Sequence, residues 1–364
     1  MTLSLGIVGL PNVGKSTLFN VLSKAAKAEA ANYPFCTISP NIGIVEVPDD
    51  RLLALANNFN SAKIVPAVIE FYDIAGLVKG AHKGEGLGNQ FLSHIREVDA
   101  MAHVVRCFSA SDVVHVEGNV HPVRDIELID AELILADLAS VDKRYEVTKK
   151  ATKSGDKTAM AFLQVVERVK NALEAGKAAR TVLPTFNNEE LKLLVDLPLM
   201  TFKPVLYVAN VDESGNKEQV AEIARIAVAQ GAKVVAICAK LEAELVELSP
   251  EEAKAYLAEL GLKESALDRL IQTGYDLLGL ITFFTAGEKE SRAWTITKGT
   301  KAPQAAGKIH SDMEKGFIAA DVINYQDLLN CVTYTKAKEK GLLRTEGKSY
   351  EVKDGDTIIV KFNV

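Results

Sequence analysis

The sequence lacks the features that are typical of secreted proteins, of proteins with a structural zinc site and of membrane-spanning proteins. Its 364 residues include only four cysteines, which stand far apart and form no CxxC pair. A disulfide framework and a structural zinc site are therefore not expected, and a reducing cytosol suits such a chain. No run approaches the roughly 20 apolar residues that a membrane helix needs, and the amino-terminal MTLSLGIVGL does not read as a signal peptide. We expect a cytoplasmic protein with no membrane partner.

The chain also lacks a strong charge of either sign. A net charge of −6 identifies no partner by itself, because a basic face can lie on an acidic chain. Apolar residues at 48% and charged residues at 25% are ordinary globular values, which argues against disorder. A chain of this length is expected to fold as two or three domains.

Short apolar runs alternate with helical stretches through much of the chain. The runs cover residues 3–8, 42–47, 67–72, 102–108, 204–209 and 233–238. Strands separated by helices imply right-handed crossovers and a mainly parallel sheet that is covered on both faces. The sequence therefore predicts an α/β domain, for which we take residues 1–125 and 198–277.

The segment between these two parts has helical periodicity instead. Apolar residues recur at gaps of three or four, first at Leu128, Ala131, Leu135, Leu138, Val141 and Tyr145, and again after Ser154-Gly155-Asp156 at Phe162, Val165, Val169 and Leu173. This pattern predicts two long amphipathic helices joined by a short turn. We interpret residues 126–197 as a helical coiled-coil arm inserted into the first domain.

The last part of the chain, residues 278–364, is rich in short β-type runs. In KSYEVKDGDTIIVKFNV, apolar residues alternate on both sides of Asp354-Gly355-Asp356. This alternation predicts a β-hairpin with one apolar face. We expect a small separate carboxyl-terminal domain.

The clearest motif is GLPNVGKS at residues 9–16, which matches GxxxxGK[ST] between a predicted strand and a predicted helix. Such a loop points backbone N–H groups at phosphates, and the helix amino terminus adds its positive end. The Lys15 ammonium would reach the β and γ oxygens, and the Ser16 hydroxyl would bind Mg²⁺. We assign nucleotide binding to Asn12, Val13, Gly14, Lys15, Ser16 and Thr17.

A DxxG motif, Asp73-Ile74-Ala75-Gly76, follows the strand predicted at residues 67–72. After a P-loop, Asp73 would hold the magnesium ion through water, and the Gly76 amide would meet the γ-phosphate. Thr37 in NYPFCT is a candidate for a second hydroxyl ligand of Mg²⁺. The alternatives are a chance DxxG and an ordinary turn threonine.

Asn210-Val211-Asp212-Glu213 ends the strand predicted at residues 204–209, where a GTPase would carry NKxD. Val211 stands in place of the lysine and Glu213 in place of the aspartate that reads guanine. Strict guanine specificity is therefore not expected. Cys238-Ala239-Lys240 lies where a GTPase has its SAK loop.

The position just after DxxG, where a switch GTPase often has a water-orienting glutamine, is Leu77. An alkyl side chain cannot hydrogen-bond to water. Either hydrolysis is intrinsically slow, or another group supplies this function.

Several segments together resemble the YchF (Obg-like ATPase) family of P-loop proteins: GLPNVGKST, NYPFCTI, DIAGLVKGA with GEGLGNQFL, NVDE, and a carboxyl-terminal part similar to a TGS domain. The resemblance spans residues 1–364. It implies a P-loop GTPase-like domain with an inserted arm, a β-grasp TGS domain, ribosomal subunits as partners, and ATP preferred over GTP. It places adenine contacts at Asn210 and Val211, with Glu213 also in the nucleotide site.

The same resemblance implies a catalytic histidine at His115, although His82 is nearer to Gly76 in sequence. A neutral imidazole there would position water or act as a base; the alternative is a surface-loop histidine. Asn12 also occurs in potassium-stimulated relatives of this fold, so K⁺ is a hypothesis as a second cofactor beside Mg²⁺.

Basic residues gather at the predicted tip of the arm: Lys143, Arg144, Lys149, Lys150, Lys153 and Lys157. A protruding basic arm suits contact with an RNA phosphate backbone, whereas a charge run on a helix is also typical of a solvated face. Trp294, the only tryptophan, is a candidate for base stacking or for the core. No sequence-specific reading and no DNA partner are expected.

These observations predict an ATP-binding and ATP-hydrolysing molecular switch associated with ribosomes, which also tolerates GTP. One alternative is a GTPase with relaxed base specificity. Another is a nucleotide-stabilised RNA- or ribosome-binding scaffold with negligible turnover. Nothing in the sequence demands a dimer, and we expect a monomer.

Overall fold

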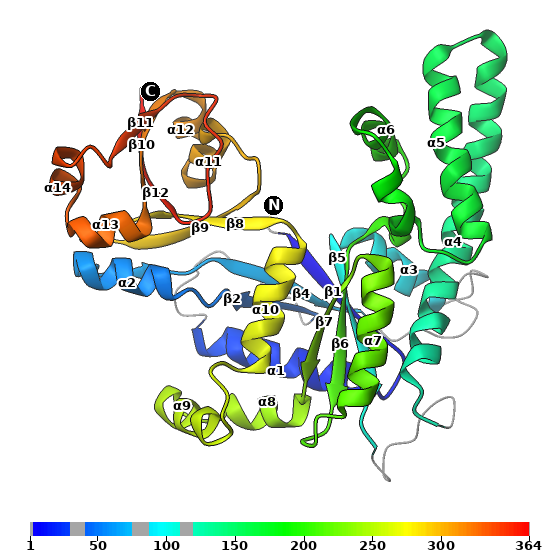
Figure 1. Ribbon diagram of the computed structural model, residues 1–364, viewed down its shortest axis with the longest axis horizontal. Helices are drawn as coiled ribbons and strands as arrows, with labels where there is room; N and C mark the ends of the chain where they lie inside the picture. The colour runs from blue at the N-terminus through cyan, green and yellow to red at the C-terminus, as the bar shows by residue number, and fades with distance from the viewer. Residues whose placement is uncertain (1–2, 30–40, 75–86, 110–118, 364) are drawn as a thin grey trace.

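The computed structural model describes residues 3–29, 41–74, 87–109 and 119–363. It combines a central six-stranded sheet, a long helical hairpin and a second six-stranded sheet towards the carboxyl terminus (Figure 1). No helix in these ranges is both long and apolar enough to cross a membrane.

The first sheet forms the centre of the molecule, and its strands lie in the order β2-β4-β1-β5-β6-β7. They are β1 (Ser4–Val8), β2 (Ile42–Glu46), β4 (Val68–Asp73), β5 (Ala100–Cys107), β6 (Val205–Val211) and β7 (Lys233–Ile237). Strand β2 is antiparallel to β4, and the other neighbours are parallel. Strands β1, β5 and β6 are buried along their whole length, as expected when helices cover both faces. All six predicted strands are confirmed.

Helices connect and cover these strands: α1 (Lys15–Glu29), α2 (Asp50–Phe59), α3 (Leu87–Glu97), α7 (Lys217–Gln230), α8 (Ala239–Leu245), α9 (Pro250–Glu259) and α10 (Ala266–Leu277). Helix α10 shows why the sequence folds in this way. Ser265 caps it through a capping box with Asp268. Its apolar face buries Leu270 and Ile271, and it packs against β6, β7 and β8. Because it contacts both sheets, α10 helps to hold them together.

The predicted arm is present as α4 (Pro122–Ala151) and α5 (Lys157–Glu174), which project away from the central sheet (Figure 1). In the turn, Gly155 has a φ of 78°, a left-handed conformation that favours glycine. Asp156 then caps α5 by accepting from the Thr158 amide at 2.8 Å. The short α6 (Asn188–Leu193) packs against α5.

The apolar stripe of α5 matches the prediction, whereas that of α4 matches it only in part. Phe162, Val165 and Val169 are buried. On α4, however, Leu135 is 44% exposed, whereas Ile134 is only 6% exposed. One part of this 30-residue helix packs on the central core and another packs on α5, so a single stripe along the helix does not describe it.

The second sheet has the strand order β11-β10-β12-β8-β9-β3. Its strands are β3 (Ile64–Val65), β8 (Leu280–Thr285), β9 (Ser291–Thr297), β10 (Phe317–Asn324), β11 (Arg344–Glu346) and β12 (Asp356–Phe362). Helices α11 (Ala302–Ile309), α12 (Ser311–Lys315), α13 (Tyr325–Cys331) and α14 (Tyr334–Glu339) accompany it. This is the predicted β-rich carboxyl-terminal region.

The predicted terminal hairpin is wrong. Strand β12 pairs with β10 in antiparallel fashion and with β8 in parallel, while Glu351 forms only an isolated bridge to Lys301. Asp356 instead accepts hydrogen bonds from the Tyr350 hydroxyl (2.7 Å) and the Lys353 amide (2.9 Å). Alternating residues show which face of a strand is buried, but they do not identify its partner strand.

The two sheets are joined closely. Strand β3 belongs to the chain segment between α2 and β4 but pairs with β9 of the second sheet. Arg51 of α2 forms ion pairs with Asp49 (2.7 Å) and with Asp354 of the second sheet (2.6 Å). Buried residues of both parts form one continuous hydrophobic cluster. The structure shows no gap between the two parts at residues 277 and 278. The domain boundary there therefore stays a prediction.

Candidate nucleotide-binding site

The P-loop follows β1 and has the backbone conformation that its glycines permit. A Cβ atom on Gly9 would lie 2.6 Å from the Val104 carbonyl oxygen, and one on Gly14 would lie 2.2 Å from Asn210 Nδ2. Gly14 also has a φ of 97°, and Asn12 has a φ of 62°. Both positions lie in the region that side chains with a Cβ rarely adopt. The loop therefore lies close to its neighbours at both glycines.

Helix α1 begins directly at the end of this loop. The Leu18 amide donates to the Gly14 carbonyl oxygen at 3.0 Å, so the amides just before it have no partner within the helix. These are the amides of Lys15, Ser16 and Thr17, at the positive end of a 15-residue helix. Such an arrangement binds an anion, and phosphate above all.

The Lys15 side chain lies under the loop rather than in solvent. It is 8% exposed, and its Nζ donates to the Leu10 carbonyl oxygen at 2.6 Å. Burial lowers the pKa of Lys15 to about 8, while the nearby Asp73 carboxylate opposes that decrease. A phosphate group would supply the negative charge that this buried ammonium needs.

Asp73 ends β4 beside the P-loop strand, where Ile7 is its partner in the ladder. Burial raises the pKa of Asp73, and the charge of Lys15 counteracts that increase. The Ser16 side chain is exposed at the start of α1. A hydroxyl and a carboxylate are hard oxygen donors of the kind that Mg²⁺ prefers when a nucleotide supplies the remaining oxygens. The residues present therefore fit a magnesium ion.

Asn210 lies buried at the end of β6 and connects two loops. Its Nδ2 donates to the Val13 carbonyl oxygen (2.9 Å), and its Oδ1 accepts from the Ala239 amide (3.2 Å). The side chain thus joins the P-loop to the start of α8. It was predicted as a base contact, and its first role in this structure is to position these two segments.

The residues after Asn210 form the rim of the site. Val211 is only 8% exposed. The Glu213 carboxylate lies 3.4 Å from the Lys240 ammonium, and both side chains are mostly exposed. Glu213 is therefore directed towards Lys240, the last residue of the SAK-like segment.

One residue and one pairing near the site escaped the sequence analysis. Arg106 is 2% exposed within β5, opposite Asn210 in the ladder. Its Nε donates to the Phe108 carbonyl oxygen at 3.2 Å. The sequence did offer a signal for Arg106, because it is a charged residue inside the apolar run AHVVRCF. The pairing of Lys240 with Glu213 had no local signal, since 27 positions separate them.

Several predicted site residues lie outside the described part of the chain: Thr37, Gly76, Leu77, His82 and His115. The residues that the structure does bring together come from the carboxyl ends of neighbouring parallel strands. That edge of an open α/β sheet is where such folds bind ligands. A P-loop on β1–α1, an aspartate ending β4 and an asparagine ending β6 define a P-loop nucleoside triphosphatase with a GTPase-like fold.

Comparisons with known proteins agree with this class. Residues 4–129 match a family model described as 50S ribosome-binding GTPase, and residues 280–363 match the YchF-GTPase C-terminal model, described as a protein of unknown function. The ribosome-binding ATPase YchF of Bacillus subtilis is 55% identical over 370 residues and covers 100% of each chain. That of Escherichia coli O157:H7 is 51% identical over 361 residues and covers 99% of each.

Among solved structures, the Schizosaccharomyces pombe YchF GTPase has a TM-score of 0.89 at 39% identity, covering 99% of this chain and 98% of that one. A GTP-binding protein from Pyrococcus horikoshii has a TM-score of 0.61 at 21% identity and supports the fold alone. The chain therefore belongs to the YchF family.

Proposed function

We propose that this chain is a ribosome-binding ATPase that acts as a molecular switch in the cytoplasm. The observation that carries the proposal is the glycine-lined P-loop held by Asn210 against α8. Relatives that match the chain over its full length, at 55% and 51% identity, are described as ribosome-binding ATPases. This similarity is the reason for proposing the ribosome as the partner and ATP hydrolysis as the reaction. The residues assigned to the triphosphate are those of the P-loop, Asn12, Val13, Gly14, Lys15, Ser16 and Thr17, together with Gly76 of the DxxG motif.

The preference for ATP rests on the residues around the base. A guanine-reading aspartate would accept from two N–H groups of the base. Glu213 stands at that position and is paired with Lys240, and Val211 replaces the lysine that would cover the ring. Asn210 and Val211 are then left to contact adenine.

A GTPase with relaxed base specificity is the second candidate. The observation that favours it is that the S. pombe relative is described as a GTPase, as is the family model that matches residues 4–129. Competition between labelled ATP and unlabelled GTP separates the two candidates. Tenfold weaker competition by GTP supports the ATPase, and an equal or stronger effect of GTP contradicts it.

P-loop nucleoside triphosphatases generally use Mg²⁺, and we assign its protein ligands to Ser16, Thr37 and, through water, Asp73. Bound magnesium would neutralise charge on the phosphate oxygens. His115 is assigned to orient the attacking water, and Asn12 to a potassium site. Equal hydrolysis rates in sodium and potassium buffers would remove the potassium assignment.

The arm is assigned to RNA or ribosome contact. The basic residues near its tip, among them Lys149, Lys150 and Lys153, are exposed and form no ion pair with another described residue. Exposed cations without a described carboxylate partner on a projecting element suit a phosphate backbone, without sequence reading and without a need for DNA. The molecule is proposed to act as a monomer.

Single-turnover hydrolysis of ATP, with and without ribosomes, tests the switch against the scaffold alternative. A switch shows measurable turnover that ribosomes stimulate. A scaffold shows negligible turnover under both conditions, and that result would remove the proposed reaction while leaving nucleotide binding intact.

A further inference from the structure

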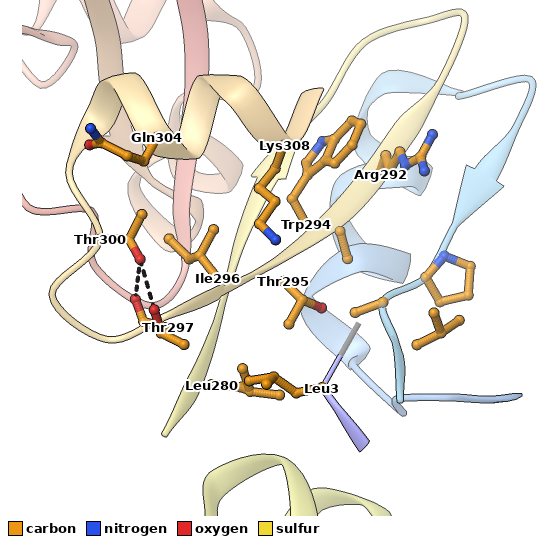
Figure 2. Close-up of a pocket in the computed structure, with 14 residues that line it drawn as sticks. Leu3, Leu280, Arg292, Trp294, Thr295, Ile296, Thr297, Thr300, Gln304 and Lys308 are labelled. Carbon is orange, nitrogen blue, oxygen red and sulfur yellow. Dashed lines mark hydrogen bonds between the residues drawn. The ribbon is translucent and has the colours of Figure 1, made fainter. Parts of the chain in front are cut away.

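A groove of about 500 Å³ lies between the two sheets, away from the nucleotide site. One wall is β9 with α11, and the other is formed by Leu3 and residues 66–68 (Figure 2). Leu3 precedes β1 and residue 68 begins β4, so the groove lies at the amino ends of the strands whose carboxyl ends hold the P-loop and Asp73. Nothing in the ATPase reaction uses it.

One wall of the groove is a strand edge that is only partly paired. Strand β3 pairs with β9 over two residues, Ile64 with Ser291 and Val65 with Arg292. The chain then reaches Pro66, which lacks an amide hydrogen and turns towards β4. The rest of β9, residues 293–297, has no strand beside it on this side in the described part of the chain.

Two backbone hydrogen bonds of β9 show which of its N–H and C=O groups face the groove. The Ser291 amide donates to Lys63 on the β3 side (2.9 Å), whereas the Lys298 amide donates to Gly279 on the β8 side (2.9 Å). Successive residues point to opposite sides, so Ala293, Thr295 and Thr297 direct their groups towards the groove. The Thr297 carbonyl is occupied by the Thr300 amide (3.1 Å). The Ala293 carbonyl, both groups of Thr295 and the Thr297 amide have no bond to any described residue.

The side chains around this edge are apolar and cationic. Leu3 and Leu280 give an apolar floor, and Arg292 and Lys308 reach the groove from β9 and α11 (Figure 2). The Arg292 guanidinium lies over the Trp294 ring at 4.1 Å. Neither cation has an ion pair with a described carboxylate, and no described residue lining the groove is acidic. Within the described residues, the groove therefore has no acidic side chain, and the outward groups of β9 named above have no backbone partner.

We propose that this groove binds an extended acidic segment of another protein, which adds to β9 as a continuation of β3. One residue of the segment donates to the Ala293 carbonyl and accepts from the Thr295 amide. The residue two positions later donates to the Thr295 carbonyl and accepts from the Thr297 amide. Its acidic side chains pair with Arg292 and Lys308. Strand addition supplies affinity through the main chain, and the cations and the apolar floor supply selectivity.

The test uses the full-length chain and a fluorescein-labelled peptide of alternating valine and glutamate, followed by fluorescence anisotropy. Lys308→Glu reverses a charge in the groove, and Lys315→Glu reverses an exposed charge outside it. Thr297→Pro removes the outward amide on an edge where proline is tolerated, and Thr297→Ala keeps that amide. We expect Lys308→Glu and Thr297→Pro each to weaken binding by about tenfold, while the two controls change it less than about twofold.

Hydrogen exchange gives a second readout that does not depend on affinity. The amides of Thr295 and Thr297 are expected to exchange rapidly in the free protein and to become protected when the peptide binds. ATP hydrolysis without partners is expected to be the same in all four variants, which also shows that each one folds.

Four results would overturn the proposal: no binding of the acidic peptide, equal binding of its lysine-for-glutamate counterpart, equal affinity in all variants, or unchanged exchange at the two amides. Binding of a short single-stranded RNA that Lys308→Glu abolishes would make the groove a nucleic-acid site instead. Self-association that Thr297→Pro abolishes, measured by sedimentation, would make it an interface between copies of this chain.

Discussion

Asn210 connects the P-loop with α8 through the two ends of one amide group. Its donor end meets a carbonyl of the loop and its acceptor end meets a backbone amide. The arrangement is specific for asparagine, because aspartate would bring an oxygen 2.9 Å from the Val13 carbonyl oxygen. A buried acceptor facing another acceptor costs more than an absent side chain.

This geometry predicts an order of effects. Asn210→Ala is expected to weaken ATP binding about 30-fold, since two hydrogen bonds of about 1 kcal/mol each are lost. Asn210→Asp is expected to weaken it further. Equilibrium binding of a fluorescent ATP analogue measures both variants. An aspartate variant that binds better than the alanine variant would show that the side chain does not hold the loop in this way.

Lys15 illustrates a conflict between stability and binding at a single residue. Burial lowers its pKa from 10.5 to about 8, so the unfolded chain binds more protons than the folded chain between those values. The free energy of unfolding contributed by Lys15 therefore rises with pH across that window. At pH 7 the buried ammonium is expected to cost about 3 kcal/mol in the nucleotide-free protein.

Replacing Lys15 with methionine tests this cost. Without nucleotide, Lys15→Met is expected to raise the free energy of unfolding at pH 7 by about 1–3 kcal/mol, and this advantage should shrink as the pH approaches 10. The same variant is expected to lose ATP binding. Urea unfolding at several pH values measures the effect, with exposed Lys24→Met as the control. A destabilised Lys15→Met protein at pH 7 would contradict this assignment.

At the scale of elements, the base of the arm is fixed by a buried carboxylate. Asp137 of α4 accepts from the amides of Met200 (3.1 Å) and Thr201 (2.7 Å) and from the Thr201 hydroxyl (2.7 Å). Met200 and Thr201 lie just before β6. The direction of the arm is therefore tied to the strand that ends at Asn210.

Removing this carboxylate is expected to loosen the arm. Asp137→Ala leaves the two amides and the hydroxyl without their acceptor, which is expected to lower the free energy of unfolding by about 3 kcal/mol. Asp142→Ala, on the same helix but half exposed, is expected to change it by about 0.5 kcal/mol or less. Urea denaturation compares the two. Equal effects would mean that the buried carboxylate does not anchor the arm.

The elements also show which parts of the fold local sequence can predict. Six strands and the P-loop followed from runs and spacing within a few residues, because burial on both faces and the phosphate cradle leave local patterns. The pairing partners of the strands and side chains could not be predicted in this way. The placement of β3 in the second sheet, the pairing of β12 with β8, and the contact of Lys240 with Glu213 depend on residues distant in sequence. No local pattern encodes such contacts.

For the whole molecule, Arg51 is a polar contact between the nucleotide-binding part and the carboxyl-terminal part. Besides its ion pairs with Asp49 and Asp354, its guanidinium lies 5.3 Å from the Phe284 ring centre and 5.7 Å from that of Tyr325. Helix α2, which carries it, follows β2 and precedes β3. Arg51 therefore links the segment between β2 and β3 to the carboxyl-terminal part.

The sole tryptophan, Trp294, lies in the second sheet and reports on it separately. In the unmodified protein, unfolding followed by tryptophan fluorescence and by far-ultraviolet circular dichroism is expected to coincide. Arg51→Ala is expected to lower stability by about 2 kcal/mol and to move the fluorescence transition to lower urea. Arg344→Ala, an exposed arginine of β11, serves as the control. Coincident transitions in Arg51→Ala would mean that the apolar contacts alone couple the two parts.

The most direct test of the whole account is a crystal structure of the chain with magnesium and a non-hydrolysable ATP analogue. The account predicts phosphates against the amides of residues 12–17, with Lys15 turned from the Leu10 carbonyl to a phosphate oxygen. The adenine ring should lie beside Asn210 and Val211. Phosphates bound elsewhere, or a base distant from Asn210, would contradict it.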